Sequence, residues 1–210
     1  MRFADRSDAG RVLARALADR TWTDPLVLGL ARGGVPVAVE VASALGGELG
    51  VAVARKIGAT GHPEYGVGAV TADGAPIFDE DALRLLRLTA DDLAETCAAE
   101  RQEARRRLAR YRDGPVRLEG RDVLVVDDGL ATGVTARAAL REARGQRPGR
   151  LVLAVPVGAA DAVRALAEDA DLVVCPHARA DFRAVGRFYE RFDQVTDDQV
   201  VALLGGQGSR

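Results

Sequence analysis

A run of four apolar residues that ends in two adjacent acids is the feature that most constrains the fold of this chain. Residues 123–126 read Val-Leu-Val-Val, and Asp127, Asp128 and a glycine- and threonine-rich turn follow them. Such a short apolar run is typical of a buried strand, and the Ala/Leu spacing behind the turn is typical of a helix. The segment therefore predicts a strand–loop–helix unit whose loop carries the polar groups.

The same alternation of apolar runs and helical patterns continues along the chain. Further apolar runs that predict strands lie at 25–31, 49–57, 150–156 and 171–175. Buried strands that alternate with helices form a parallel sheet covered by helices on both faces. We therefore expect an α/β fold in a single domain over residues 1–210, with a mainly helical insertion at about 71–118.

Composition and charge argue against several classes of protein. The formal net charge of the 210 residues is −2, whereas a dedicated nucleic-acid binder usually carries a basic excess. Cys97 and Cys175 are the only cysteines, so nothing indicates a disulfide framework. The start of the chain is too charged for a signal peptide, and no apolar run has membrane-spanning length. We expect a cytoplasmic protein with neither a nucleic-acid nor a membrane partner.

An arginine-rich run at 100–112 is the segment that most suggests a nucleic-acid partner. Glu100 and Glu103 lie within this run, close in sequence to its arginines. On a helix, acids three or four residues from arginines form ion pairs. We therefore interpret the run as a solvated helix face with these two glutamates as partners.

The polar loop that follows the predicted strand at 123–126 is suited to a sugar phosphate. In open α/β sheets, ligands bind outside the carboxyl ends of the strands, where Asp127 and Asp128 are expected. Backbone N–H groups of the loop and the start of the helix attract a phosphate. Two carboxylates would repel that phosphate, so sugar hydroxyls or a Mg²⁺ ion are their natural partners.

This segment resembles the phosphoribosyl-pyrophosphate binding motif of type I phosphoribosyltransferases. Residues 123–135, VLVVDDGLATGVT, have the apolar strand, the two acids and the small-residue loop with threonines of that motif. The resemblance implies the type I phosphoribosyltransferase fold, and it implies that Asp127 and Asp128 bind the ribose 2′- and 3′-hydroxyls. It also implies that the 5′-phosphate is bound by the following loop, which consists of Ala131, Thr132, Gly133, Val134 and Thr135.

A second glycine-containing turn, GLARGGVPVA at 29–38, lies between a predicted strand and a predicted helix. Arg32 supplies a permanent charge there, and two glycines can expose backbone donors to an anion. Taken alone, the stretch is explained equally well as a tight turn that needs glycine. In the phosphoribosyltransferase family, the loop after the first core strand holds the pyrophosphate. The resemblance thus assigns that role to Ala31, Arg32, Gly33 and Gly34.

Lys56 ends the second predicted strand. The resemblance implies that a basic residue here contacts pyrophosphate, with Arg55 as the fallback, and an exposed lysine at a strand end is the alternative. We expect Arg32 and Lys56 to be the catalytic residues.

The glycine-dense stretch 58–66 lies where the family has a mobile flap. We therefore expect a loop that closes over the reaction and excludes water, followed by a weak strand at 67–70.

The C-terminal stretch 177–195 is the candidate hood, the part of this family that recognises the acceptor. Its apolar side chains can stack on a flat ring or form a small core of the hood's own, and we favour the core. These side chains are Phe182, Val185, Phe188, Tyr189 and Phe192. Ala131 stands where the hypoxanthine–guanine enzymes have a further aspartate, which argues against a 6-oxopurine. The identity of the acceptor therefore stays open.

The resemblance implies a transferase that moves the 5-phosphoribosyl group from phosphoribosyl pyrophosphate to a nitrogenous base and releases pyrophosphate. It implies Mg²⁺ as the cofactor, held through substrate and water rather than by direct protein ligands. A non-catalytic, nucleotide-sensing module on the same fold is the alternative, and the presence of Arg32, Lys56 and the flap favours the enzyme. A response-regulator receiver also starts with an apolar strand and two acids, but the glycine loop has no function there. The oligomeric state, including a homodimer, is left open.

Overall fold

A five-stranded parallel sheet forms the centre of the molecule. The computed structural model describes residues 2–59, 61–112, 114 and 116–206. The spatial order of the strands is β2-β1-β6-β7-β9, and neighbouring strands are parallel throughout. The strands are β1 (Leu26–Leu30), β2 (Glu48–Ala52), β6 (Asp122–Val126), β7 (Arg150–Ala154) and β9 (Leu172–Val174). The predicted α/β fold with a parallel sheet is confirmed.

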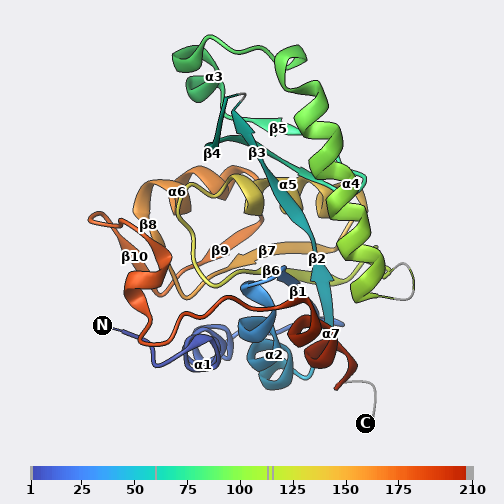
Figure 1. Ribbon diagram of the computed structural model, residues 1–210. Helices are drawn as coiled ribbons and strands as arrows, with labels where there is room; N and C mark the ends of the chain where they lie inside the picture. The colour runs from blue at the N-terminus through green and yellow to red at the C-terminus, as the bar shows by residue number, and fades with distance from the viewer. Residues whose placement is uncertain (1, 60, 113, 115, 207–210) are drawn as a thin grey trace.

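Helices cover both faces of this sheet (Figure 1). On one face lie α1 (Arg6–Leu17) and α2 (Gly34–Leu45), and on the other lie α5 (Val134–Gly145) and α6 (Ala160–Ala165). Successive side chains of a strand point to opposite faces. In β6, Leu124 and Val126 accordingly pack with α1 and α2, whereas Val123 and Val125 pack with α5. Burial on both faces explains why the strand sequences are continuous apolar runs.

The predicted strand at 49–57 is wrong in its extent, because the chain changes sheet within it. After β2 ends at Ala52, residues of the same run form β3 (Ala54–Ala59) in a separate antiparallel sheet. Val51 and Val53 are buried in one cluster with residues of two helices further along the chain, at 94–111 and 197–205, so the sequence stays apolar across the break. A continuous apolar run does not reveal that its two halves belong to different sheets.

The loop predicted at 58–66 is also wrong, because most of it belongs to a β-hairpin. The strand β4 (His62–Thr71) pairs with β3 and with the short β5 (Ile77–Phe78), while Thr60 lies outside the described residues. A glycine further along β4 permits a close contact between the strands. A Cβ atom on Gly68 would lie 2.4 Å from the carbonyl oxygen of Ile77.

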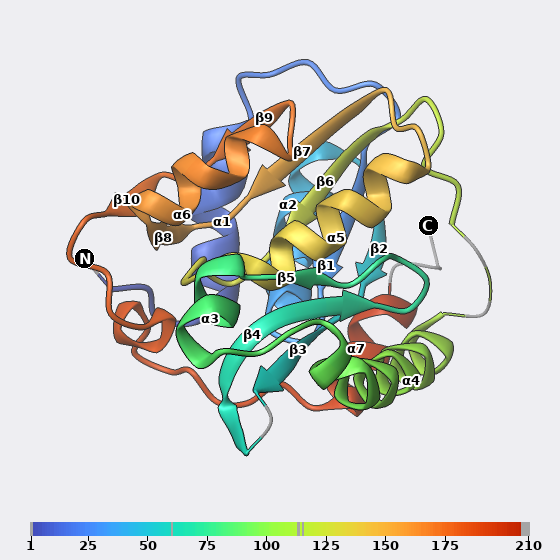
Figure 2. The same ribbon diagram turned by 90° about the horizontal axis from the view of Figure 1, so that it is seen from above.

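The remaining elements flank the two sheets (Figures 1 and 2). After β5 come α3 (Glu80–Leu86), the 3₁₀ turn η1 (Asp91–Leu93) and the long α4 (Ala94–Tyr111). α4 packs against β3 and against α7 (Asp197–Gly205), and Figure 2 shows these two helices side by side at the edge of the molecule. Among the described residues, no helix combines the length and apolar character needed to cross a membrane.

The C-terminal stretch that contains the candidate hood is short of regular structure. The strand β8 (Val157–Ala159) pairs in parallel with β10 (His177–Arg179), and the two form a small sheet of their own. The 3₁₀ turns η2 (Leu166–Glu168) and η3 (Val185–Phe188) complete this part. From η3 the chain runs along the molecule to α7 (Figure 1), whose first turn is fixed by a capping box of Thr196 and Gln199.

Candidate active site

Asp127 and Asp128 lie just beyond the carboxyl end of β6, the middle strand of the parallel sheet. Oδ1 of Asp127 accepts a hydrogen bond of 2.8 Å from the backbone N–H of Asp128. Oδ2 of Asp128 pairs with Nε of Arg6, the first residue of α1, at 2.8 Å. Tyr189, which follows η3, donates its hydroxyl to the backbone carbonyl oxygen of Asp128 at 2.5 Å. Two distant parts of the chain, the start of α1 and the residue after η3, therefore hold the acid pair.

The ionisation of the two carboxyl groups depends on their burial and on the charges around them. Burial raises the pKa of Asp127 well above its ordinary value, and the negative charge of Asp128 raises it further, while Arg6 and Lys56 oppose both effects. Burial also raises the pKa of Asp128, against the attraction of Arg6. Desolvation disfavours the charged form of a carboxyl group, and a nearby cation favours it. Arg6 is therefore the group that most favours an ionised Asp128.

The loop between β1 and α2 approaches the acids so closely that only glycine fits. A Cβ atom on Gly33 would lie 2.1 Å from Oδ2 of Asp128, and one on Gly34 would lie 2.3 Å from the carbonyl oxygen of Val126. These distances are well inside van der Waals contact, so a larger residue would displace the acids. The structure thus brings the two predicted glycines and the two predicted acids into one site. The peptide bond between Ala31 and Arg32 in this loop is cis.

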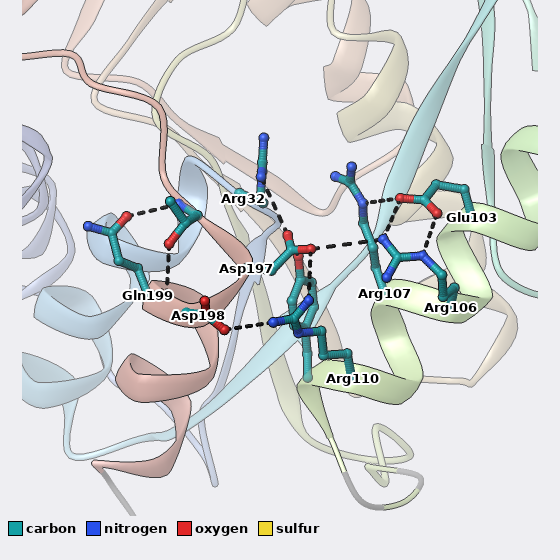
Figure 3. Close-up of polar contacts among 10 residues, drawn as sticks. Arg32, Glu103, Arg106, Arg107, Arg110, Asp197, Asp198 and Gln199 are labelled. Atoms are coloured by element: carbon teal, nitrogen blue, oxygen red, sulfur yellow. Dashed lines mark hydrogen bonds and ion pairs between the residues drawn. The ribbon is translucent and has the colours of Figure 1, made fainter.

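Arg32 extends from the same loop toward the C-terminal helix (Figure 3). Its Nη1 atom lies 3.5 Å from Oδ1 of Asp197, the first residue of α7, and 23% of the Arg32 side chain is exposed. The guanidinium therefore stands between the predicted pyrophosphate loop and an acid that the sequence patterns did not single out.

Lys56 and Thr135 line one cavity of about 640 Å³. That volume is within the usual range of small-molecule sites. The wall opposite β3 is formed by Thr96 and Glu100 of α4, and Glu100 pairs with Arg55 at 2.7 Å. Lys56 is exposed in the middle of β3 rather than at a strand end, and among the described side chains no carboxylate forms an ion pair with it, whereas Arg55 has Glu100. Of the two neighbouring cations, Lys56 is therefore the one available to a ligand.

The predicted phosphate loop is anchored at one residue and exposed at the next two. Leu130 is buried and hydrogen-bonded through its backbone to β8, whereas Ala131 and Thr132 are exposed. Gly133 has a φ of 78°, which favours glycine, and no side chain caps the helix α5 that starts behind it. Uncapped N–H groups at a helix start can bind an anion.

The residues of this loop do not all face one cavity. Thr135 faces the cavity with Lys56, whereas Thr132 and Val134 line another cavity of about 630 Å³ beside Arg137.

The aromatic side chains of the hood pack mainly on one another. The rings of Phe182 and Phe188 stack with 5.3 Å between their centroids, and Tyr189 is buried against Phe3. These side chains belong to a small core, as favoured, but the hood shares that core with Phe3, Ala9 and Val157 from outside it. Val185 packs on the loop after the acids, since a Cβ atom on Gly129 would lie 2.6 Å from its Cγ1.

Sequence patterns missed three charged residues at or near the site. Arg6 and Asp197 act on partners far away in the chain, and nothing local distinguishes them from other exposed arginines and first-turn acids. Glu100 was assigned to the arginine-rich run, but it pairs with Arg55 instead. Glu103 does bind the run as predicted, through Arg106 and Arg107.

Comparisons with known proteins agree with this arrangement. A family model described as "Phosphoribosyl transferase domain" matches residues 6–189. Two curated Mycobacterium tuberculosis proteins, "Putative phosphoribosyl transferase Rv0571c" of strain H37Rv and "Putative phosphoribosyl transferase MT0597" of strain CDC 1551, are each 47% identical over 207 residues. The match covers 96% of this chain and 46% of each of those proteins, so the chain spans about half the length of the curated relatives it matches.

A solved structure resembles the chain over nearly its whole length. It is the crystal structure of TT1426 from Thermus thermophilus, with a TM-score of 0.81 and 46% sequence identity. The alignment covers 97% of this chain and 98% of that one. The two proteins therefore share their fold over nearly their whole length.

Proposed function

Because the chain belongs to the phosphoribosyl transferase domain family, we propose that it transfers the 5-phosphoribosyl group of phosphoribosyl pyrophosphate to a nitrogenous base. The observation that carries this proposal is the contact of Gly33 with Asp128. It puts a loop suited to an anion directly beside two acids suited to sugar hydroxyls. Phosphoribosyl pyrophosphate likewise has its pyrophosphate group directly beside its ribose.

The acids retain oxygen atoms for the ribose. Oδ2 of Asp128 is occupied by Arg6 and Oδ1 of Asp127 by a backbone N–H, so one oxygen of each acid is left to accept hydroxyl hydrogen bonds. The 5′-phosphate would lie at the uncapped start of α5, on the side where Thr135 faces the cavity with Lys56, whereas Thr132 faces the other cavity. Helix N–H groups and the helix dipole favour an anion at that position.

The leaving group would be bound by the loop of Gly33 and Gly34 together with Arg32 and Lys56. As the bond from C1 of the ribose to the pyrophosphate oxygen breaks, its electron pair moves to pyrophosphate and positive charge develops on the ribose. A nitrogen of the base then forms the new bond to C1 and loses its proton. Fixed cations near the leaving oxygen stabilise this transition state more than the ground state.

Mg²⁺ fits this site as an ion carried mainly by the substrate. No cluster of three or more His, Cys, Asp or Glu that could hold a metal occurs in the part of the chain that the structure describes. The free oxygens of Asp127 and Asp128 are assigned to the ribose, so substrate phosphates and several waters, which Mg²⁺ commonly binds, would hold the ion. When bound, the ion would neutralise charge on the pyrophosphate.

A panel of purine, pyrimidine and other nitrogen bases, assayed for pyrophosphate release from phosphoribosyl pyrophosphate with Mg²⁺, tests the proposal. We expect release with at least one base, and we expect the Arg32→Ala variant to lose it. The Asp161→Asn variant, whose acid is exposed and pairs with Arg164 alone among the described residues, is the control. Tight nucleotide binding without release from any base would favour the nucleotide-sensing module instead.

A further inference from the structure

A carboxylate from near the end of the chain lies against the arginine of the predicted pyrophosphate loop. Oδ1 of Asp197 is 3.5 Å from Nη1 of Arg32, and the same oxygen accepts the hydroxyl of Tyr111 at 2.6 Å (Figure 3). Tyr111 is the last residue of α4, and Asp197 is the first of α7. One acid therefore connects the β1–α2 loop, the insertion helix and the C-terminal helix.

Other arginines surround Asp197, but each has a closer partner. Nη1 of Arg110 and Nη2 of Arg106 lie 3.6 and 3.9 Å from Oδ2 of Asp197. Arg106 pairs more closely with Glu103, and Arg110 with Asp198, at 2.6 Å in both cases. Arg32 differs from them, because Asp197 is its sole carboxylate partner among the described residues.

The local structure keeps Asp197 ionised and fixed in place. The hydrogen bond from Tyr111 lowers the pKa of Asp197, and the nearby arginines lower it further against the effect of burial. Burial, followed by the hydrogen bond to Asp197, raises the pKa of Tyr111 to about 12, so its hydroxyl keeps the proton that it donates. The capping box of Thr196 and Gln199 fixes the turn that carries Asp197.

The contact holds Arg32 without saturating it. A guanidinium has five N–H donors, and Asp197 approaches one nitrogen of Arg32 at the limit of hydrogen-bond distance. A competitor for the arginine would form a close, two-pronged pair, as Glu103 does with Arg106. Asp197 has Tyr111 as its stronger partner, so it can orient the guanidinium and still leave most of the donors free for an anion.

We propose that Asp197 is a positioning residue for Arg32, which it orients for binding the pyrophosphate group before the donor arrives. This inference rests on the proposed function, because it assumes that Arg32 binds pyrophosphate. A side chain that is fixed before binding loses less conformational entropy when the anion binds. The C-terminal helix and the last residue of the insertion helix would thereby contribute to the orientation of Arg32.

A double-mutant cycle with Mg²⁺-pyrophosphate as the probe tests this inference by calorimetry. We expect Asp197→Asn, which keeps the size and the Tyr111 contact but removes the charge, to weaken binding about three- to tenfold, as for coupled neighbours. In the Arg32→Ala background the same substitution should change the affinity less than about twofold. Tyr111→Phe should weaken binding in the same direction but less, and it serves as the second variant if Asp197→Asn does not fold.

The matched control is Asp198→Asn, one residue further along the same helix turn. Asp198 pairs with Arg110 and is 87% exposed, so its loss should leave pyrophosphate affinity unchanged. Tighter binding by Asp197→Asn would show that Asp197 competes with the anion, and an equal loss with and without Arg32 would show a merely structural role; each result overturns the inference. A wild-type protein that binds neither pyrophosphate nor the donor would overturn the proposed function, and the inference with it.

Discussion

Arg6 and Asp128 form an ion pair, 2.8 Å from Nε to Oδ2, that connects the first turn of α1 to the acid pair at the end of β6. The two side chains are only 12% and 13% exposed. The same guanidinium donates from Nη1 to the carbonyl oxygen of Asp193 at 2.7 Å and lies 4.0 Å from the centre of the Phe192 ring. Arg6 therefore fixes the C-terminal segment to the acids and supplies their nearest positive charge.

The Arg6→Gln substitution should shift the pH range over which donor affinity changes to higher pH than in the wild type. Burial already raises the pKa of both acids, and Arg6 opposes that effect, so its removal raises the pKa of Asp128 and Asp127 further. Ionised carboxylates are the better acceptors for ribose hydroxyls. As the pH is lowered, the affinity for phosphoribosyl pyrophosphate should therefore begin to fall at a higher pH in the variant than in the wild type.

Calorimetry of donor binding between about pH 5 and pH 9 measures the effect of Arg6. Arg11→Gln is the control, because Arg11 lies on the same helix but pairs at 3.5 Å with the more exposed Asp8 and Glu40. An identical pH profile for Arg6→Gln and the wild type would contradict this account of the ion pair.

Asp127→Asn should stabilise the fold at neutral and alkaline pH. The folded-state pKa of Asp127 is raised, so the folded protein binds this proton more tightly than the unfolded chain does. Stability is therefore lost as the pH rises from the ordinary aspartate range through the raised pKa, and the loss is complete above it. Asparagine has no such titration.

Thermal unfolding at pH 8 and at pH 4 checks the cost of Asp127 to the fold. At pH 8 the Tm of the variant should be higher than that of the wild type. In a chain of this size, each kcal/mol gained in the free energy of unfolding raises the Tm by about 2–4 °C. The advantage should shrink at pH 4. A variant that is less stable than the wild type at pH 8 would contradict this prediction, because it would show that Asp127 stabilises the fold.

Gly33→Ala should damage the acid pair directly. The new Cβ atom would lie 2.1 Å from Oδ2 of Asp128, so the carboxylate must leave its contact with Arg6 or the loop must move. Overpacking of this kind typically costs about 1–3 kcal/mol of stability. Donor affinity should fall as well, while Gly145→Ala, whose Cβ atom meets nothing within 4 Å, should bind the donor normally.

Arg32→Ala should lower turnover more than it weakens donor binding. Negative charge grows on pyrophosphate as the bond to the ribose breaks, so a fixed cation contributes most in the transition state. The loss of one such contact is typically worth about 3–4 kcal/mol, or roughly a hundred- to a thousand-fold in kcat. Lysine at this position should rescue only part of the rate, because it lacks the planar fork of arginine. An increase in KM with an unchanged kcat would instead make Arg32 a ground-state anchor.

The sequence was most informative where function depends on neighbours in the chain. Asp127, Asp128 and the loop behind them were predictable, because one strand–loop–helix segment contains them all. The sheet change at Val53 was not predictable, since Val51 and Val53 are buried in the same cluster and the run stays apolar across the break. Arg6 and Asp197 could not be found either, because their ion pairs with Asp128 and Arg32 join residues more than a hundred positions apart.

Binding of phosphoribosyl pyrophosphate in the presence of Mg²⁺, measured by calorimetry on the wild type and on the Asp127→Asn/Asp128→Asn double variant, tests the central claim most directly. Hydrogen bonds to charged groups are worth about 1.5–3 kcal/mol each, so the loss of both acids should weaken binding at least about a hundred-fold. The Asp161→Asn variant should bind as the wild type does. Unchanged affinity in the double variant, with a normal melting curve, would contradict the assignment of the acid pair to the ribose.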